Sequence, residues 1–195
     1  MKRNKEKVKG KGIVKKIVLS ILGVFLLAIV LGISILTSIV GTINKEYKVG
    51  EIVIGEGQKT ALVIYQPSKS NKSKDISMSI AQTMVDQGYK VTVNVPSKDL
   101  SYDWEKYDVI AFGSPIYMGK VSPVLKSYVE RNPVANKKIL IYAMGSSSAD
   151  STVEIDEMNT WVSTNNNIVK LKCKVEEKEA FENLVKKSII TWNVK

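Results

Sequence analysis

The sequence predicts an α/β protein: a doubly wound, five-stranded parallel sheet with helices on both faces, preceded by one transmembrane helix. Residues 17–43 form a run of 27 uncharged residues dominated by Ile, Leu, Val and Gly. After residue 59, short β-branched runs typical of strands alternate with segments whose apolar residues recur at helical spacing. Strands that alternate with helices form right-handed βαβ units, which build a three-layer α/β/α fold around a parallel sheet.

The apolar run at residues 17–43 is long enough to cross a bilayer, which requires about 20 residues. The apolar core of a cleaved signal peptide is shorter, about 7 to 15 residues, so a retained anchor is the favoured interpretation. Residues 1–16 hold eight basic residues and one acidic residue. This basic tail predicts a cytoplasmic N-terminus and an extracytoplasmic globular part, in a single-pass protein of the cell membrane that contacts the lipid bilayer through residues 17–43.

The charge and the composition exclude several function classes. Residues 17–195 hold 21 basic and 18 acidic residues, so only +3 of the formal net charge of +10 lies outside the tail. The basic character therefore indicates membrane topology and no nucleic-acid partner. The chain has no histidine and one cysteine, Cys173, which excludes Ser/His/Asp and Cys/His catalysis and an internal disulfide. We therefore expect neither catalytic side chains nor a metal site.

The globular domain is predicted at residues 60–195, after a linker at 44–59 that mixes charges with glycine. Within the linker, residues 52–54 could form a short edge strand. The five strands of the sheet are expected at residues 60–65, 90–95, 108–112, 137–142 and 168–175.

The first two helices have recognisable ends. One is predicted over residues 71–87 and stops before Gly88, a residue suited to the left-handed backbone that follows many helices. The next should begin at Ser122 and Pro123, because serine is a favoured N-cap and proline a favoured first helical residue.

The last two helices are predicted from spacing and charge. Ser151 and Glu154 have the separation of a capping box. The final helix should begin near Glu176 and bury a single apolar face that consists of Phe181, Leu184, Val185 and Ile189.

The loop after the first main strand is a candidate phosphate site. In doubly wound sheets, ligands bind beyond the carboxyl ends of the strands, and the free N–H groups at a helix start attract anions. The loop lacks both the triphosphate and the dinucleotide glycine motifs, so a monophosphate fits better. An ordinary serine-capped turn is the alternative. The candidate residues are Ser68, Lys69, Ser70, Asn71, Lys72 and Ser73.

The loops after the third and fourth strands could hold a flat ring. Tyr117 is a plausible aromatic platform, although it could instead pack inward as a lid on the core. The later loop has small side chains that leave room for a ring system. The candidate residues are Ser114, Pro115, Ile116, Tyr117, Met118 and Gly119 in the first of these loops, and Gly145, Ser146, Ser147 and Ser148 in the second.

These loops resemble those of the flavodoxin family over about residues 60–192. "SKSNKS" lies where that family has its S/T-x-T-G-x-T phosphate loop, and "GSPIYMGKVSP" is similar to its first flavin-flanking loop. The resemblance implies strand order 2-1-3-4-5 and a non-covalently bound flavin mononucleotide (FMN). It implies that Ser68, Ser70 and Ser73 hold the phosphate, that Tyr117 faces the isoalloxazine, and that backbone groups of residues 114–119 and 145–148 border the ring.

Three features depart from the family pattern. One is Lys72, whose positive charge should favour a phosphate. Asn71 stands where glycine is usual, which the chain can tolerate because asparagine enters the left-handed region more readily than other non-glycine residues. The loop "MGSSSADS" lacks the second stacking aromatic.

Two functions follow from the resemblance. The first is a membrane-anchored FMN protein that transfers electrons or reduces a quinone-type acceptor, with a redox partner that the sequence does not identify. The cofactor supplies the chemistry, so no histidine is needed. The alternative is a cofactor-free module that keeps the fold and binds a partner at the membrane surface.

Overall fold

The computed structural model describes residues 2–48, 50–145, 151–162, 165–174 and 177–193. The chain divides into two compact units, Met1–Gly41 and Thr42–Lys195.

The first unit is part of one long helix, α1 (Lys2–Ile43). Its segment Lys16–Ser38 is long and apolar enough to cross a membrane by length and composition. Apolar side chains on all sides of this segment, among them Leu19, Phe25 and Leu31, are more than half exposed. A helix that is apolar all round is typical of an apolar environment.

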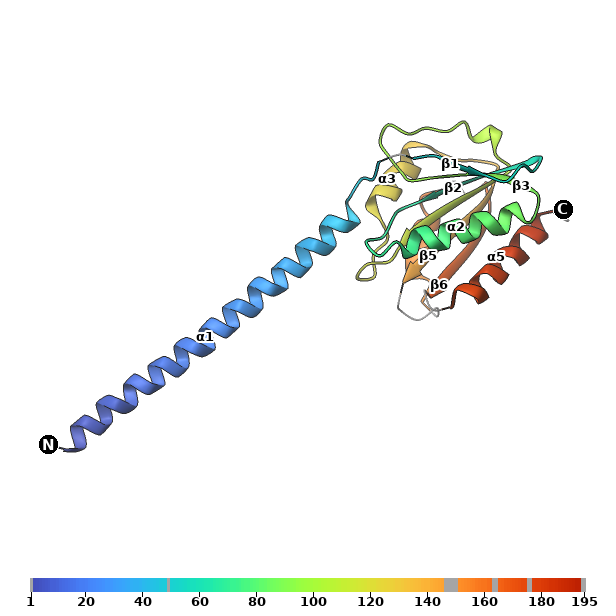
Figure 1. Cartoon of the computed structure of the whole chain (residues 1–195). Coiled ribbons are helices and arrows are strands. Elements are labelled where there is room, and N and C mark those ends of the chain that lie inside the picture. The colour runs from blue at the N-terminus through green and yellow to red at the C-terminus, as the bar shows by residue number, and fades with distance from the viewer. Residues whose placement is uncertain (1, 49, 146–150, 163–164, 175–176, 194–195) are drawn as a thin grey trace. The chain divides into compact units, whose positions relative to one another are not determined.

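The second unit is a three-layer α/β/α fold around a six-stranded sheet (Figure 1). The strand order is β1-β3-β2-β4-β5-β6. The strands are β1 (Ile52–Ile54), β2 (Lys59–Tyr65), β3 (Tyr89–Asn94), β4 (Val109–Pro115), β5 (Lys138–Gly145) and β6 (Asn167–Lys174). The five strands β2 to β6 are parallel and have the predicted order 2-1-3-4-5.

The expected number of five strands is wrong by one, because the possible edge strand in the linker does form. Strand β1 pairs antiparallel with β3, with Ile52 opposite Val93. It has only three residues in a segment rich in glycine and charge, so its extended conformation depends on pairing with β3.

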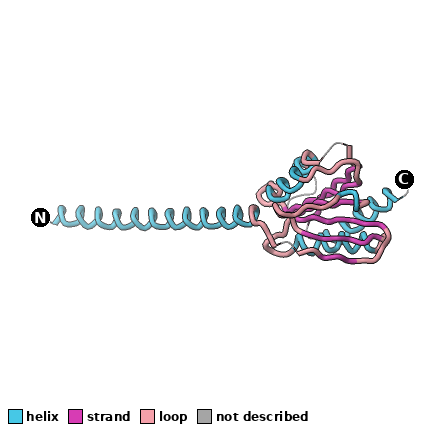
Figure 2. The backbone as a smooth tube through the Cα atoms, turned by 90° about the horizontal axis from the view of Figure 1, so that it is seen from above, coloured by secondary structure: helices cyan, strands magenta, loops and turns pink. Residues whose placement is uncertain are grey.

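Helices cover both faces of the sheet, which Figure 2 shows as a layer of strands between them. Helices α2 and α5 pack on one face with a core that includes Val63, Ile80 and Val185. Helices α3 and α4 pack on the other with Leu62 and Leu125. The helices are α2 (Lys72–Val85), the 3₁₀ turn η1 (Trp104–Lys106), α3 (Pro123–Arg131), α4 (Val153–Asn159) and α5 (Lys178–Asn193).

Two of the predicted helix-end residues are confirmed. The Ser122 side chain accepts a hydrogen bond from the Leu125 N–H at 3.2 Å, with Pro123 as the first residue of α3. Helix α2 ends at Val85, two residues before the predicted end, and Gly88 has the expected left-handed backbone with φ 85°, which glycine adopts without strain.

The predicted capping box of Ser151 and Glu154 is wrong. Helix α4 begins at Val153, and its N-cap Thr152 makes no side-chain capping bond. The Glu154 carboxylate instead lies 3.1 Å from the Lys172 ammonium on β6. The carboxylate that the capping box would have bonded to the backbone therefore forms an ion pair with a buried cation on the neighbouring strand β6.

The predicted apolar face of α5 is correct except for Leu184. Phe181, Val185 and Ile189 are buried, whereas Leu184 is 49% exposed. Residues spaced by four give a narrow stripe, and Leu184 lies beside it. This narrow stripe is enough because α5 packs mainly on α2 and β6, at the edge of the sheet.

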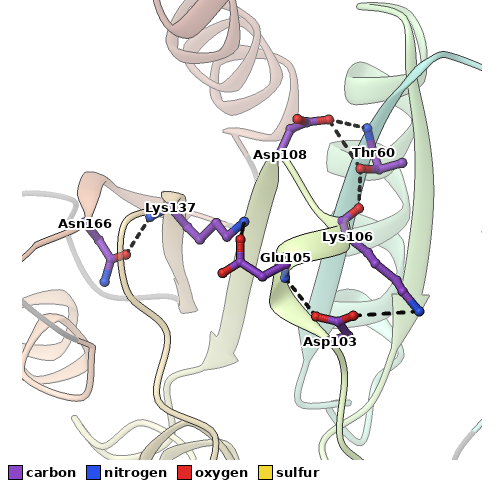
Figure 3. A network of polar contacts seen from close by, with 7 residues as sticks. All are labelled: Thr60, Asp103, Glu105, Lys106, Asp108, Lys137 and Asn166. Atoms are coloured by element: carbon purple, nitrogen blue, oxygen red, sulfur yellow. Dashed lines mark hydrogen bonds and ion pairs between the residues drawn. The ribbon is translucent and has the colours of Figure 1, made fainter.

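Polar side chains connect the amino ends of the strands (Figure 3). The Asp108 carboxylate accepts a hydrogen bond from the Thr60 N–H at 2.7 Å. Lys137 donates from its side chain to Glu105 at 3.1 Å and from its backbone to Asn166 at 2.9 Å. These bonds tie the starts of β2, β4, β5 and β6 together, at the end of the sheet opposite the loops that follow β2 and β4.

Candidate functional site

The loops that follow β2 and β4 meet at the carboxyl edge of the sheet, beside the end of β5. Strand β2 lies between β3 and β4, so the order of the parallel strands reverses beside it. The Gln66 N–H donates to the Gly113 carbonyl at 2.9 Å, and the Ile116 N–H donates to the Met144 carbonyl at 2.7 Å. The predicted candidate residues from the first two loops, together with Gly145, are therefore brought to one place, where ligands bind in such sheets.

Asn71 closes the loop after β2 and starts helix α2. Its backbone is left-handed, with φ 59° and ψ −5°, which confirms the conformation expected where the family has glycine. Its carbonyl accepts the Asp75 N–H at 3.0 Å, so the chain turns directly into the helix. The N–H groups of Lys72 and Lys74 belong to the first turn, where the helix itself provides no acceptor.

The left-handed backbone of Asn71 gives a test of the loop by stability. Such a conformation costs an ordinary L-residue about 1–2 kcal/mol and costs glycine nothing. We expect Asn71→Ala to lower the free energy of unfolding by about 1 kcal/mol and Asn71→Gly to leave it unchanged or raise it. Chemical denaturation of both variants measures this, and equal stability of Ala and Gly would contradict the assigned conformation.

Two of the three predicted phosphate serines hydrogen-bond to each other's backbone. The Ser73 Oγ accepts the Ser68 N–H at 2.5 Å, and the Ser68 Oγ accepts the Ser73 N–H at 3.1 Å. Both residues are buried, whereas Ser70 is exposed together with Lys69 and Lys72. Each buried hydroxyl keeps its own hydrogen to donate. The pair thus shapes the loop, and phosphate binding by these hydroxyls stays a prediction.

A buried chain of hydrogen-bonded hydroxyl groups connects the same loop to strand β5. The Tyr142 hydroxyl donates to the Ser77 Oγ at 2.7 Å, and the Ser77 Oγ donates to the Ser73 carbonyl at 2.6 Å. Burial raises the pKa of Tyr142 well above its usual value, against the smaller opposing effect of its bond to Ser77. A Cβ at Gly113 would lie 2.1 Å from the Tyr142 Cζ, so only glycine leaves room for the ring.

The loop after β4 is rigid up to its tip. Tyr117 and Lys120 exchange two backbone hydrogen bonds of 2.9 and 3.0 Å around Met118 and Gly119. Both central residues have positive φ, 52° and 71°, as a type I′ turn requires. The buried Ser114 Oγ accepts the Ser122 N–H at 2.8 Å and so fixes the base of the loop. The predicted residue Ser114 therefore has a structural role here.

Tyr117 links the two loops. Its ring is half-buried, and its hydroxyl accepts a hydrogen bond from the Lys69 N–H at 3.2 Å. The aromatic ring is therefore one hydrogen bond from the loop that leads into α2.

The third loop is described only at its beginning. Gly145 is buried, and a Cβ there would lie 3.2 Å from the Ile116 Cβ, so the end of β5 contacts the β4 loop closely. The predicted residues Ser146, Ser147 and Ser148 lie outside the described residues.

Gln66 and Lys45 are residues of this region that the sequence analysis missed. Gln66 is 1% exposed, and its Nε2 donates to the Lys45 carbonyl at 2.9 Å. Because Lys45 precedes the predicted domain, no spacing or motif in the sequence connects the two residues.

A separate groove of about 670 Å³ runs along α2 and includes Lys72, Ser79 and Glu182 in its lining. Asp75 and Asp86 also line it, so its acidic groups disfavour a phosphate. Only Lys72 is shared with the candidate phosphate loop, which is the better anion site.

Comparisons with known proteins agree with this fold. The family model described as "Flavodoxin domain" matches residues 62–178. The flavodoxin of Streptococcus pneumonia TIGR4 has 14% sequence identity and a TM-score of 0.50, over 68% of this chain and 99% of that one. Oxidised Flavodoxin 2 from Bacillus cereus has 16% identity and a TM-score of 0.52, over the same shares of the two chains. No curated protein sequence matches the chain. The chain belongs to the flavodoxin domain family.

Proposed function

We propose that this chain is a membrane-anchored flavoprotein that binds FMN non-covalently and transfers electrons or reduces a quinone-type acceptor. The hydrogen bond of 3.2 Å between the Lys69 N–H and the Tyr117 hydroxyl carries this proposal. It joins an aromatic ring to the loop that leads into the anion-attracting start of α2, and a ring-bearing monophosphate needs both features.

The phosphate end of FMN fits the loop after β2. The first turn of α2 offers backbone N–H groups, and the exposed Ser70 adds a hydroxyl donor. The exposed ammonium groups of Lys69 and Lys72 add positive charge. The mutual bonds of Ser68 and Ser73 hold these donors in place before a ligand binds, which reduces the entropy lost on binding.

The ring end of FMN would lie beside the loop after β4 and the end of β5. Tyr117 would face the ring and exclude water from one side, and backbone groups of residues 114–119 with Gly145 would border it. FMN, when bound, supplies the electron chemistry, since it accepts and donates one or two electrons. The residues of the chain bind it, orient it and shield it from water.

The membrane part of the proposal is supported by helix α1. Lys16–Ser38 has the length and composition of a bilayer-spanning helix. With the basic residues before it, the proposed topology has the N-terminus in the cytoplasm and the globular unit outside.

A second candidate function, a cofactor-free module that binds a partner, is favoured by one observation. The hydrogen bonds between Ser68 and Ser73, and between Lys69 and Tyr117, already satisfy several donors of the loop without any ligand. An FMN titration separates the two functions. FMN fluorescence should be quenched at micromolar protein if the first is correct and should stay unchanged if the second is.

The phosphate assignment predicts a selective effect of Ser70→Ala. A hydrogen bond to a charged group contributes about 1.5 kcal/mol or more, so the Kd for FMN should rise roughly tenfold. Riboflavin lacks the phosphate, and its Kd should stay the same. Parallel quenching titrations of full-length protein with both flavins measure this, and equal losses for the two would contradict the assignment.

A further inference from the structure

The linker after helix α1 lies against the globular unit, although its composition predicts a simple spacer. The Gln66 side chain donates to the Lys45 carbonyl at 2.9 Å. The Gly50 N–H donates to the Asn94 side chain at 3.2 Å. Between these two attachments, the Tyr47 ring is half-buried and packs on the core beneath α2 and α5.

Gln66 places the linker beside the candidate flavin site. Its backbone N–H donates to the Gly113 carbonyl near the end of β4, and the phosphate loop begins two residues after Gln66. Its side chain reaches Lys45 from this position. The Lys45 carbonyl is therefore within one side-chain length of the point where the two loops meet.

The surroundings of Tyr47 agree with this location. Burial raises the pKa of Tyr47, and the nearby Tyr117 hydroxyl raises it further. The Lys45 ammonium lies 5.1 Å from the centre of the Tyr47 ring, a distance typical of a cation–π contact. The linker thus brings a second aromatic ring and a cation to the vicinity of Tyr117.

The Gln66 side chain also has an acceptor without a donor. Its Oε1 is buried and has no hydrogen-bond partner within the part of the chain that the structure describes. A buried acceptor without a partner is destabilising, so this atom indicates a missing donor. The hydroxyl groups on the sugar-alcohol chain of FMN are donors of the required kind.

We propose that residues 44–48 form a further wall of the FMN site and that Gln66 is the positioning residue that holds this wall. The inference rests on the proposed function, because it assigns linker residues to the same site. If the linker completes the site, FMN binding and linker docking stabilise each other by equal amounts.

Trypsin cleavage can report whether the linker is docked, because trypsin cleaves after lysine and both Lys45 and Lys48 are exposed. The experiment uses the full chain in lipid nanodiscs, with cleavage at these two lysines followed by mass spectrometry. We expect saturating FMN to slow cleavage at both. Gln66→Met keeps the side-chain volume and removes the amide, so it should speed cleavage without FMN. It should also raise the Kd for FMN about three- to tenfold, as for one lost hydrogen bond.

Two further variants make the test specific. Tyr47→Ala removes a linker side chain that lies outside the sheet, and it should also weaken FMN binding and remove the protection of Lys48. Gln87→Met is the matched control, because Gln87 follows the far end of α2 and should behave as wild type.

The outcomes separate the inference from the proposed function. In one outcome, wild type binds FMN, FMN does not slow cleavage, and both Gln66→Met and Tyr47→Ala bind FMN as wild type does. This outcome would overturn the inference that residues 44–48 line the site, and the proposal that the chain binds FMN would stand. If wild type does not bind FMN at all, the proposed function fails and this inference fails with it.

Discussion

Replacing Lys172 with methionine is expected to lower the free energy of unfolding of the globular unit by about 3–5 kcal/mol. The Lys172 side chain is 4% exposed and the Glu154 side chain 8%, and their charged groups are 3.1 Å apart. The Lys172 ammonium also donates to the Ser151 carbonyl at 2.8 Å. Methionine keeps most of the volume but leaves the Glu154 carboxylate buried without a cation. Chemical denaturation followed by tryptophan fluorescence measures the loss.

The neighbouring ion pair of the same strand and helix provides the control. Lys170 and Asp156 are 2.8 Å apart, but their side chains are 43% and 49% exposed. Lys170→Met should therefore cost much less than Lys172→Met, because solvent screens this pair. The double variant Glu154→Leu with Lys172→Met should regain most of the loss, because it removes both charges. An equal cost for Lys170→Met and Lys172→Met would show that burial is not the cause.

Replacing Tyr117 with alanine is expected to raise the Kd for FMN by about one to two orders of magnitude. Stacking of a heterocycle on an aromatic side chain contributes about 1–3 kcal/mol, and each 1.4 kcal/mol is a factor of about ten. The Kd for riboflavin should rise by a similar factor, because the lost contact is with the ring. Quenching titrations with both flavins therefore distinguish this change from Ser70→Ala, which should affect FMN alone.

Tyr117→Phe separates the ring from the hydroxyl. Phenylalanine keeps the stacking surface and loses only the bond to the Lys69 N–H. The Kd for FMN should stay within about threefold of wild type, since a single neutral hydrogen bond contributes little net free energy. A Phe variant as weak as the Ala variant would mean that the hydroxyl, and not the ring, is the important group.

The sequence was sufficient to predict the sheet because each parallel strand is a short apolar run between polar segments. Strands such as β5, buried on both faces, leave little ambiguity. The strand β1 was uncertain for the opposite reason, since its conformation depends on pairing with β3 and not on its own composition. Glu154 was misassigned because a helix-capping pattern is local, whereas its actual partner Lys172 is 18 residues away.

The candidate site was predictable where it depends on local backbone. The left-handed conformation of Asn71 follows from its residue type and its place before a helix. The mutual bonds of Ser68 and Ser73 were not predictable, because a serine hydroxyl can bind a ligand or the backbone equally well. The contact of Gln66 with Lys45 was inaccessible to any pattern, because it joins the linker to the domain across 21 residues.

The outermost strand β6 has a consequence for self-association. Lys170, Lys172 and Lys174 alternate along it, and it is an outer strand of the described sheet. Lys170 and Lys174 keep partly exposed charged side chains at this edge, paired with Asp156 and Glu177, and a strand from a second copy would have to displace or desolvate them. Lysines on edge strands oppose such pairing. At the other edge of the sheet, β1 has just three residues with which a strand of a second copy could pair. Copies crowded at high surface density should therefore remain separate rather than polymerise through their sheets.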